Sequence, residues 1–205
     1  MPFIHTIAPT AADGEVAALY LRQQSAWGYV PDYATVFCHR PEVMARWGQL
    51  LAEIRRPMDV RRFELVTFAA AHELRNSACS LAHGRKLREF LSDAEITAIA
   101  KGEPGDGLTE AERAMLRFAR QIARDASQVS QVQVDELKAF GLSDAEVFDI
   151  AATAAGRAFF AKLLDALGVV ADSPSLALDD ALREALTVGR PIGVEPPRTI
   201  PVRSP

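Results

Sequence analysis

The chain has 205 residues, of which 49% are hydrophobic and 24% charged, and its formal net charge at pH 7 is −4. This composition is typical of one globular domain, or at most two small ones, and excludes a disordered or fibrous chain. An acidic chain also gives no sign of the basic face that nucleic-acid binding requires. No apolar run approaches the ~20 residues that span a bilayer, and the N-terminal segment does not resemble a signal peptide. We therefore expect a cytoplasmic protein that binds neither nucleic acid nor membranes.

Helix start signals recur along the chain and predict an all-α fold. In several places a Ser or Thr is followed three positions later by an acidic residue or Gln, which is the pattern of a capping box. These pairs are Thr10/Asp13, Ser92/Glu95, Thr109/Glu112, Ser130/Gln133 and Ser143/Glu146. Gly141 and Gly168 lie where helices are expected to end, and Pro41 lies where one begins. No stretch alternates with period two for long enough to predict a strand.

The predicted helices follow one another with short loops, as in antiparallel helix packing. In chain order they cover about 12–27, 32–38, 41–55, 59–75, 77–90, 93–101, 110–125, 131–140, 144–167 and 176–187. The sequence LSDAE occurs at 91–95 and again at 142–146, which we interpret as one good helix start used twice rather than as a duplicated unit. We expect residues 1–188 to form a single all-α domain.

Residues 189–205 differ from the rest because five prolines exclude a helix there. We expect this segment to be an extended C-terminal arm. Its isoleucines and valines leave three alternatives open. It is a frayed tail, or it docks on its own body, or it docks on a neighbouring subunit.

The densest cluster of reactive side chains lies within residues 59–90. Glu64 stands in an apolar stretch, where a buried carboxylate is costly unless it is paired or protonated, so it either faces solvent or has a function. Asn76 and Ser77 then interrupt the helical pattern and can cap a second helix. Cys79 lies in the first turn of that helix, with His83 one turn later on the same face. Either Cys79 is inert packing, or the helix N-terminus and the imidazole activate its thiol.

Two other patterns fall short of known motifs. The His-Glu pair at 72–73 begins like a zinc-protease motif, but Asn76 stands where the second histidine is required. The glycines between 102 and 107 lack the strand and the Lys-Ser/Thr pair of a phosphate-binding loop. The four histidines and two cysteines show no zinc-ligand spacing either. We therefore expect neither a metal nor a cofactor.

Glu64, Asn76, Cys79 and His83 together resemble the signature of the alkylhydroperoxidase D-like, carboxymuconolactone decarboxylase superfamily. That signature is a Glu, then Cys-x-x-Cys, then a His four residues past the second Cys. In this chain Asn76 replaces the first cysteine. The resemblance covers about residues 30–170, and in this region the chain is similar to the peroxidase-related branch of the superfamily. It implies a bundle of antiparallel and orthogonal helices that forms homo-oligomers.

The resemblance also implies roles for the site residues. Cys79 has the position of the peroxide-attacking thiol, Glu64 that of the base and His83 that of the proton relay. The resolving cysteine has no counterpart, and nothing in the sequence places Cys38 near Cys79. The leading hypothesis is a cofactor-free, one-cysteine peroxidase that reduces a hydroperoxide with an external thiol. The alternatives are an acid–base enzyme acting on a small carbonyl or lactone, with Cys79 a bystander, and a degenerate member without catalytic activity.

These hypotheses make geometric demands. If Cys79 is catalytic, then Glu64, Cys79 and His83 must converge on one pocket, within hydrogen-bond reach or one water of each other. The break at Asn76–Ser77 is expected to turn Cys79 back toward Glu64. The helix terminus and the imidazole would lower the pKa of the thiol below the ~8.5 of free cysteine, whereas burial would raise it.

Overall fold

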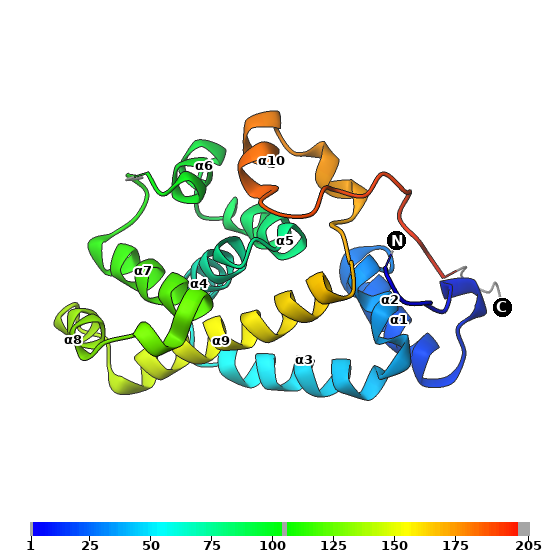
Figure 1. The fold of residues 1–205 in the computed structure, drawn as a ribbon, viewed down its shortest axis with the longest axis horizontal. Coiled ribbons are helices and arrows are strands. Elements are labelled where there is room, and N and C mark those ends of the chain that lie inside the picture. Colours follow the sequence, from blue (N-terminus) through cyan, green and yellow to red (C-terminus); the bar gives the residue numbers. More distant parts are fainter. Residues whose placement is uncertain (1, 104–105, 201–205) are drawn as a thin grey trace.

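The computed structural model describes residues 2–103 and 106–200, and there the protein is all-α (Figure 1). The α-helices are α1 (Gly14–Trp27), α2 (Asp32–Val36), α3 (Pro41–Arg55), α4 (Val60–Glu73), α5 (Ser77–Leu87), α6 (Asp93–Lys101), α7 (Glu110–Asp125), α8 (Gln131–Ala139), α9 (Asp144–Ala166) and α10 (Asp180–Leu186). Short 3-10 helices are η1 (Pro9–Ala11), η2 (Phe37–His39), η3 (Ala126–Gln128) and η4 (Ser173–Ala177). Among the described residues, β-pairing is limited to two isolated bridges. The predicted fold class is confirmed.

Most of the predicted helix starts are formed as expected. Both reciprocal hydrogen bonds of the capping box are present at Ser92, Thr109 and Ser143. At the start of α8, the Gln133 side chain accepts the backbone N–H of Ser130 at 3.0 Å. The capping box predicted at Thr10 is wrong, because Pro9 begins the 3-10 helix η1 there and α1 starts only after Asp13. Asp13 is the N-cap of α1 but makes no side-chain capping bond.

One predicted helix near the C-terminus is shorter than expected. The sequence predicts a single helix over 176–187, but this segment begins as the end of η4 and becomes α-helical only at Asp180. Pro174 lies at the start of η4, and the Asp179 side chain accepts the backbone N–H of Ala181. Because Asp179 is the N-cap, α10 starts immediately after it and not at residue 176. The sequence pattern did not indicate this cap.

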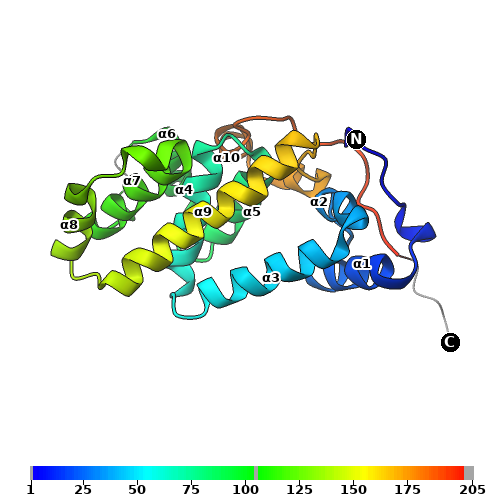
Figure 2. The same cartoon turned by 60° about the horizontal axis from the view of Figure 1, so that its bottom comes forward.

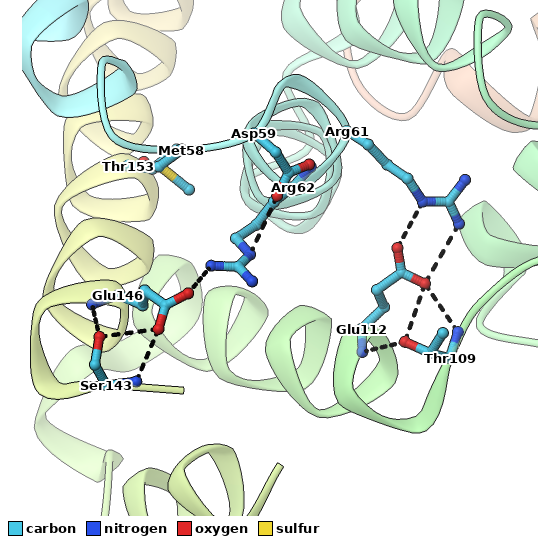
Figure 3. Close-up of polar contacts among 9 residues, drawn as sticks. All are labelled: Met58, Asp59, Arg61, Arg62, Thr109, Glu112, Ser143, Glu146 and Thr153. Carbon is cyan, nitrogen blue, oxygen red and sulfur yellow. Dashed lines mark hydrogen bonds and ion pairs between the residues drawn. The ribbon is translucent and has the colours of Figure 1, made fainter. Parts of the chain in front are cut away.

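Two consecutive arginines at the start of α4 tie it to the N-termini of α7 and α9 (Figure 3). Arg61 Nε donates to Glu112 Oε1, and Arg62 NH1 donates to Glu146 Oε1, each at 2.6 Å. Glu112 and Glu146 are the capping acids of α7 and α9. The same carboxylates therefore cap two helices and hold a third between them.

The core has two parts, which meet near the α4–α5 turn. The larger cluster is formed by α4 to α10, and the smaller one by α1 to α3 with parts of α4, α5 and α9. The long helix α9 contributes to both clusters and lies beside α3 (Figure 2). Ala71, near the end of α4, belongs to both clusters, and Cys79 belongs to the smaller one.

Residues 189–200 lie extended along the body of their own chain, from α10 to the end of the molecule that carries α1 (Figure 1). Gly193 N–H donates to Ala171 O at 2.8 Å, and Val30 N–H donates to Arg198 O at 2.7 Å. Arg198 also pairs with Asp32 at 3.0 Å. The rest of the predicted arm, residues 201–205, lies outside the described residues. Within the described part of the chain, no helix is both long and apolar enough to cross a membrane.

Candidate functional site

The turn between α4 and α5 is a sharp break, as the sequence predicts. Arg75 has a left-handed backbone with φ 58°, which ends α4 and excludes one continuous helix. Asn76 then caps α5, because its Oδ1 accepts the backbone N–H of Cys79 at 2.8 Å. Its Nδ2 donates to the Ala161 carbonyl of α9 at 3.3 Å. Asn76 is only 1% exposed, so this cap fixes the first turn of α5 against α9 from within the core.

Glu64 is buried and paired rather than solvated. It lies more than two turns before the end of α4, and the chain reversal places it against the second turn of α5. His83 Nδ1 lies 2.5 Å from Glu64 Oε2, and Lys86 Nζ lies 3.5 Å from Glu64 Oε1. The side chain of Glu64 is 3% exposed, so these two partners satisfy a carboxylate that burial would otherwise neutralise.

The Glu64–His83 pair consists of a carboxylate and a neutral imidazole at pH 7. Burial alone would raise the pKa of Glu64, but the hydrogen bonds and charges of His83 and Lys86 bring it below its usual value. Burial, helped by the positive charge of Arg157, lowers the pKa of His83 to about 4 despite the opposing effect of Glu64. A carboxylate only accepts hydrogen bonds, so Nδ1 carries the imidazole proton and Nε2 is unprotonated.

Cys79 is buried beside a guanidinium group. Its residue is 4% exposed, and Arg157 NH1, from α9, donates to Cys79 Sγ at 3.5 Å. Burial raises the pKa of the thiol, and Arg157 offsets part of that rise. Burial thus prevails over the expected activation at the helix N-terminus, and Cys79 is a protonated thiol at neutral pH. Within the described residues, no hydrogen bond joins this thiol to Glu64 or His83.

Cys79 and His83 line the same cavity, which has a volume of about 190 Å³. Arg157 also lines it, whereas Glu64 lies behind the His83 ring and does not. Aromatic side chains form part of the wall, namely Trp27, Tyr29, Tyr33, Trp47 and Phe160. The structure therefore brings together the three residues that the sequence singled out. Cys79 and His83 lie on the cavity wall, and Glu64 is connected to the cavity through its contact with His83.

Sequence reasoning missed two residues of this site, Arg157 and Lys86. Arg157 is 4% exposed, and it was detectable as the single arginine of the apolar stretch 151–161. Cys38 lies in η2, is buried and free, and does not line the cavity. Among the described residues, no group of three or more His, Cys, Asp or Glu side chains is arranged to hold a metal ion.

No protein-family model matches the sequence, and no curated protein is significantly similar to it. Solved structures are similar, however. An uncharacterised peroxidase-related protein from Ralstonia eutropha with an alkylhydroperoxidase AhpD core is 21% identical, with a TM-score of 0.68 over 91% of this chain and 100% of that one. An uncharacterised peroxidase-related protein from a Silicibacter species is 18% identical, with a TM-score of 0.69 over 85% and 98%.

The debrominase Bmp8 is a further structural neighbour. A cysteine-to-alanine variant of it, in complex with 2,3,4-tribromopyrrole, is 17% identical to this chain, with a TM-score of 0.68 over 91% of this chain and 98% of that one. At these identities the likeness concerns the fold. The protein therefore has the fold of the alkylhydroperoxidase AhpD core, as the sequence resemblance implied.

Proposed function

We propose that the protein belongs to the AhpD-like superfamily and acts as a one-cysteine peroxidase, which reduces a hydroperoxide with an external thiol. The observation that carries this proposal is the cavity wall itself. There a buried thiol, Cys79, lies one helical turn from His83, whose imidazole is neutral and is oriented by Glu64. We therefore assign His83 as the base and Glu64 as the carboxylate that orients it, in place of the base and relay roles that the resemblance implies for Glu64 and His83, because Glu64 does not line the cavity.

In the first half-reaction, His83 Nε2 takes the proton of the Cys79 thiol, directly or through one water. Glu64 stabilises the imidazolium that forms, and Arg157 stabilises the thiolate. The thiolate attacks an oxygen of the hydroperoxide, so that an S–O bond forms as the O–O bond breaks. The leaving alkoxide takes the proton from His83. Sulfur is oxidised by two electrons to the sulfenic acid, and the hydroperoxide is reduced to an alcohol.

In the second half-reaction, an external thiol attacks the sulfenic acid and gives a mixed disulfide and water. A second external thiol then releases Cys79 and leaves as the disulfide of the reductant. An external reductant is needed because Asn76 caps α5 where the resemblance implies a resolving cysteine, and Cys38 lies away from the cavity wall. We expect the protein to work as a homo-oligomer, as the resemblance implies.

A shared fold does not by itself define a reaction. The peroxidase-related neighbours support the proposed chemistry, whereas Bmp8 is a debrominase, so 2,3,4-tribromopyrrole belongs in the assay as a second substrate candidate. The Glu64–His83 pair would also serve an acid–base reaction on a small carbonyl or lactone without any thiol. A Cys79 variant separates these possibilities.

The test is peroxide consumption coupled to a small thiol such as dithiothreitol. Cys79→Ser should abolish turnover, and Glu64→Gln should reduce it by roughly 10²–10⁴-fold, because His83 then loses the carboxylate that orients its ring and stabilises its imidazolium. Cys38→Ser is the matched control and should leave the rate nearly unchanged, because that thiol does not line the cavity. Since Cys79 is protonated and His83 neutral at pH 7, the rate should be nearly constant around neutral pH and should fall as the pH approaches the His83 pKa of about 4.

Mass spectrometry after peroxide treatment should find the trapped sulfenic acid on Cys79. The peroxidase proposal is wrong if Cys79→Ser consumes peroxide as fast as the wild type. It is also wrong if the wild type shows no peroxide turnover with any of the small thiols tested. Retention of a carbonyl or lactone reaction by Cys79→Ser would favour the acid–base alternative.

A further inference from the structure

Arg157 is a buried cation without a carboxylate partner among the described residues. A guanidinium group carries five N–H donors and a positive charge. The NH1 group contacts Cys79 Sγ at 3.5 Å, and Nε is buried without any acceptor. Since Cys79 is a neutral thiol at rest, no ion pair within the described part of the chain compensates Arg157, and Asp165, whose charge also acts on the Cys79 sulfur, is paired with Arg190 at 3.9 Å. An uncompensated buried charge is costly, so the cavity beside it favours an anion.

The guanidinium is also held in a fixed position. It lies over the Phe160 ring, with its central carbon 5.4 Å from the ring centroid. Phe160 in turn stacks on Trp47 at a centroid distance of 5.8 Å and meets the edge of Tyr33 at 5.5 Å. Phe160 and Trp47 are both more than nine-tenths buried. A fixed guanidinium beside flat aromatic faces loses little conformational freedom when a planar anion binds.

The other charged residues that line the cavity also favour the binding of an anion. Arg85 and Arg157 line the cavity together with Lys86, which is already paired with Glu64, and Asp172 is the one acid among the described lining residues. Asp172 is already engaged, because its Oδ1 accepts the backbone N–H of Asp32 at 2.9 Å. The wall therefore carries an excess of positive charge, which raises the local concentration of anions.

The size of the cavity restricts the ligand to about one ring. An engineered protein cavity of about 150 Å³ binds benzene. The cavity next to Cys79 measures about 190 Å³, which leaves room for one ring with a small substituent.

We propose that the cavity binds a small aromatic carboxylate, with the carboxylate on the guanidinium of Arg157 and the ring against Phe160 and Trp47. This inference deepens the proposed function and rests on it for one point only, namely that the bound molecule is the hydroperoxide substrate. Such a substrate would hold its carboxylate close to Cys79, because Arg157 NH1 contacts the sulfur, and a hydroperoxide group near that carboxylate would then reach the thiol. The binding site itself requires no thiol chemistry.

The probe is benzoate, titrated into the Cys79→Ser protein and followed by calorimetry or by NMR. In this background no thiol reaction can occur, so the result is independent of whether the protein is a peroxidase. We expect saturable binding of benzoate and at least tenfold weaker binding of benzamide, which has the same shape without the charge. Adding Arg157→Met should weaken benzoate binding by about tenfold to a hundredfold, the range of a charge-assisted hydrogen-bonded pair.

Arg85→Met is the matched control, because Arg85 also lines the cavity but is exposed. It should change benzoate affinity by less than about threefold, as expected for an exposed charge that solvent and salt screen. Arg157→Lys keeps the positive charge but not the planar pair of N–H donors and should give an intermediate affinity. This conservative variant tests the same contact if Arg157→Met does not fold. Circular dichroism checks the fold of each variant.

Three outcomes would overturn the inference. They are equal affinity for benzoate and benzamide, undiminished benzoate binding by a folded Arg157→Met protein, and no saturable binding up to about 10 mM benzoate. In contrast, the absence of peroxidase activity together with Arg157-dependent benzoate binding would refute the proposed function and leave the anion site standing.

Discussion

Replacing His83 by Gln should make the folded protein less sensitive to mild acid. The pKa of His83 falls from 6.5 to about 4 on folding, mainly because the ring is buried. Between these two values the unfolded chain binds a proton that the folded chain does not, so the free energy of unfolding decreases as the pH is lowered through this window. From pH 7 to pH 5 this linkage removes about 2 kcal/mol, and it approaches about 3 kcal/mol near pH 4.

Other groups titrate in the same range, so the comparison must be between variants. The pKa of His72 is also lowered by burial, which adds to the acid sensitivity, whereas burial raises that of Asp172 to about 6, which opposes it. Both contributions are common to the wild type and His83→Gln and cancel in the difference. Above pH 5, Glu64 remains ionised in the wild type, because its pKa lies below its usual value.

The measurement is urea unfolding at pH 7 and at pH 5. The wild type should lose about 2 kcal/mol more than His83→Gln between these two pH values, equivalent to roughly 4–8 °C in melting temperature for a chain of this size. His5→Gln removes an exposed histidine and should behave as the wild type does. If His83→Gln loses as much stability as the wild type, then His83 is not held neutral by burial, and its assignment as the base fails with it.

Two further predictions concern the scaffold of the site. A Cβ at Gly189 would lie 1.9 Å from the Arg75 carbonyl, so Gly189→Ala should displace the arm from the α4–α5 turn and destabilise the protein by about 1–3 kcal/mol. The matched Gly48→Ala, on an exposed part of α3 with no atom near the new Cβ, should instead stabilise it by roughly 0.5–1 kcal/mol, and equal signs in urea unfolding would contradict the model of a close-packed arm. Asn76→Ala should lower the free energy of unfolding by about 2 kcal/mol, whereas the exposed cap variant Ser143→Ala should lower it by roughly 1 kcal/mol. The difference arises because Asn76→Ala leaves the buried backbone N–H of Cys79 without its acceptor. The reverse order in the same assay would show that Asn76 is not the principal cap.

Local signals in the sequence were sufficient for the helices and for the break that shapes the site. A capping box joins residues three positions apart, so Ser92, Thr109 and Ser143 could be assigned without knowledge of the fold. The cap at Asn76 is equally local, and it placed Cys79 in the first turn of α5 with His83 one turn later. The same reasoning failed at Thr10, because a 3-10 turn at Pro9 competes with the helix start.

The electrostatics of the site depend on contacts between residues far apart in the chain. Arg157 lies 78 positions from Cys79, and only the packing of α9 against α5 brings the guanidinium to the sulfur. Whether Glu64 faces solvent or pairs with His83 depends on how α4 and α5 fold back on each other. Likewise, hydrogen bonds between distant residues, such as that between Val30 and Arg198, hold the C-terminal arm against the rest of the protein. The sequence thus determines which groups are available and how each helix begins, whereas burial, which sets the pKa of Cys79 and of His83, is a property of the assembled core alone.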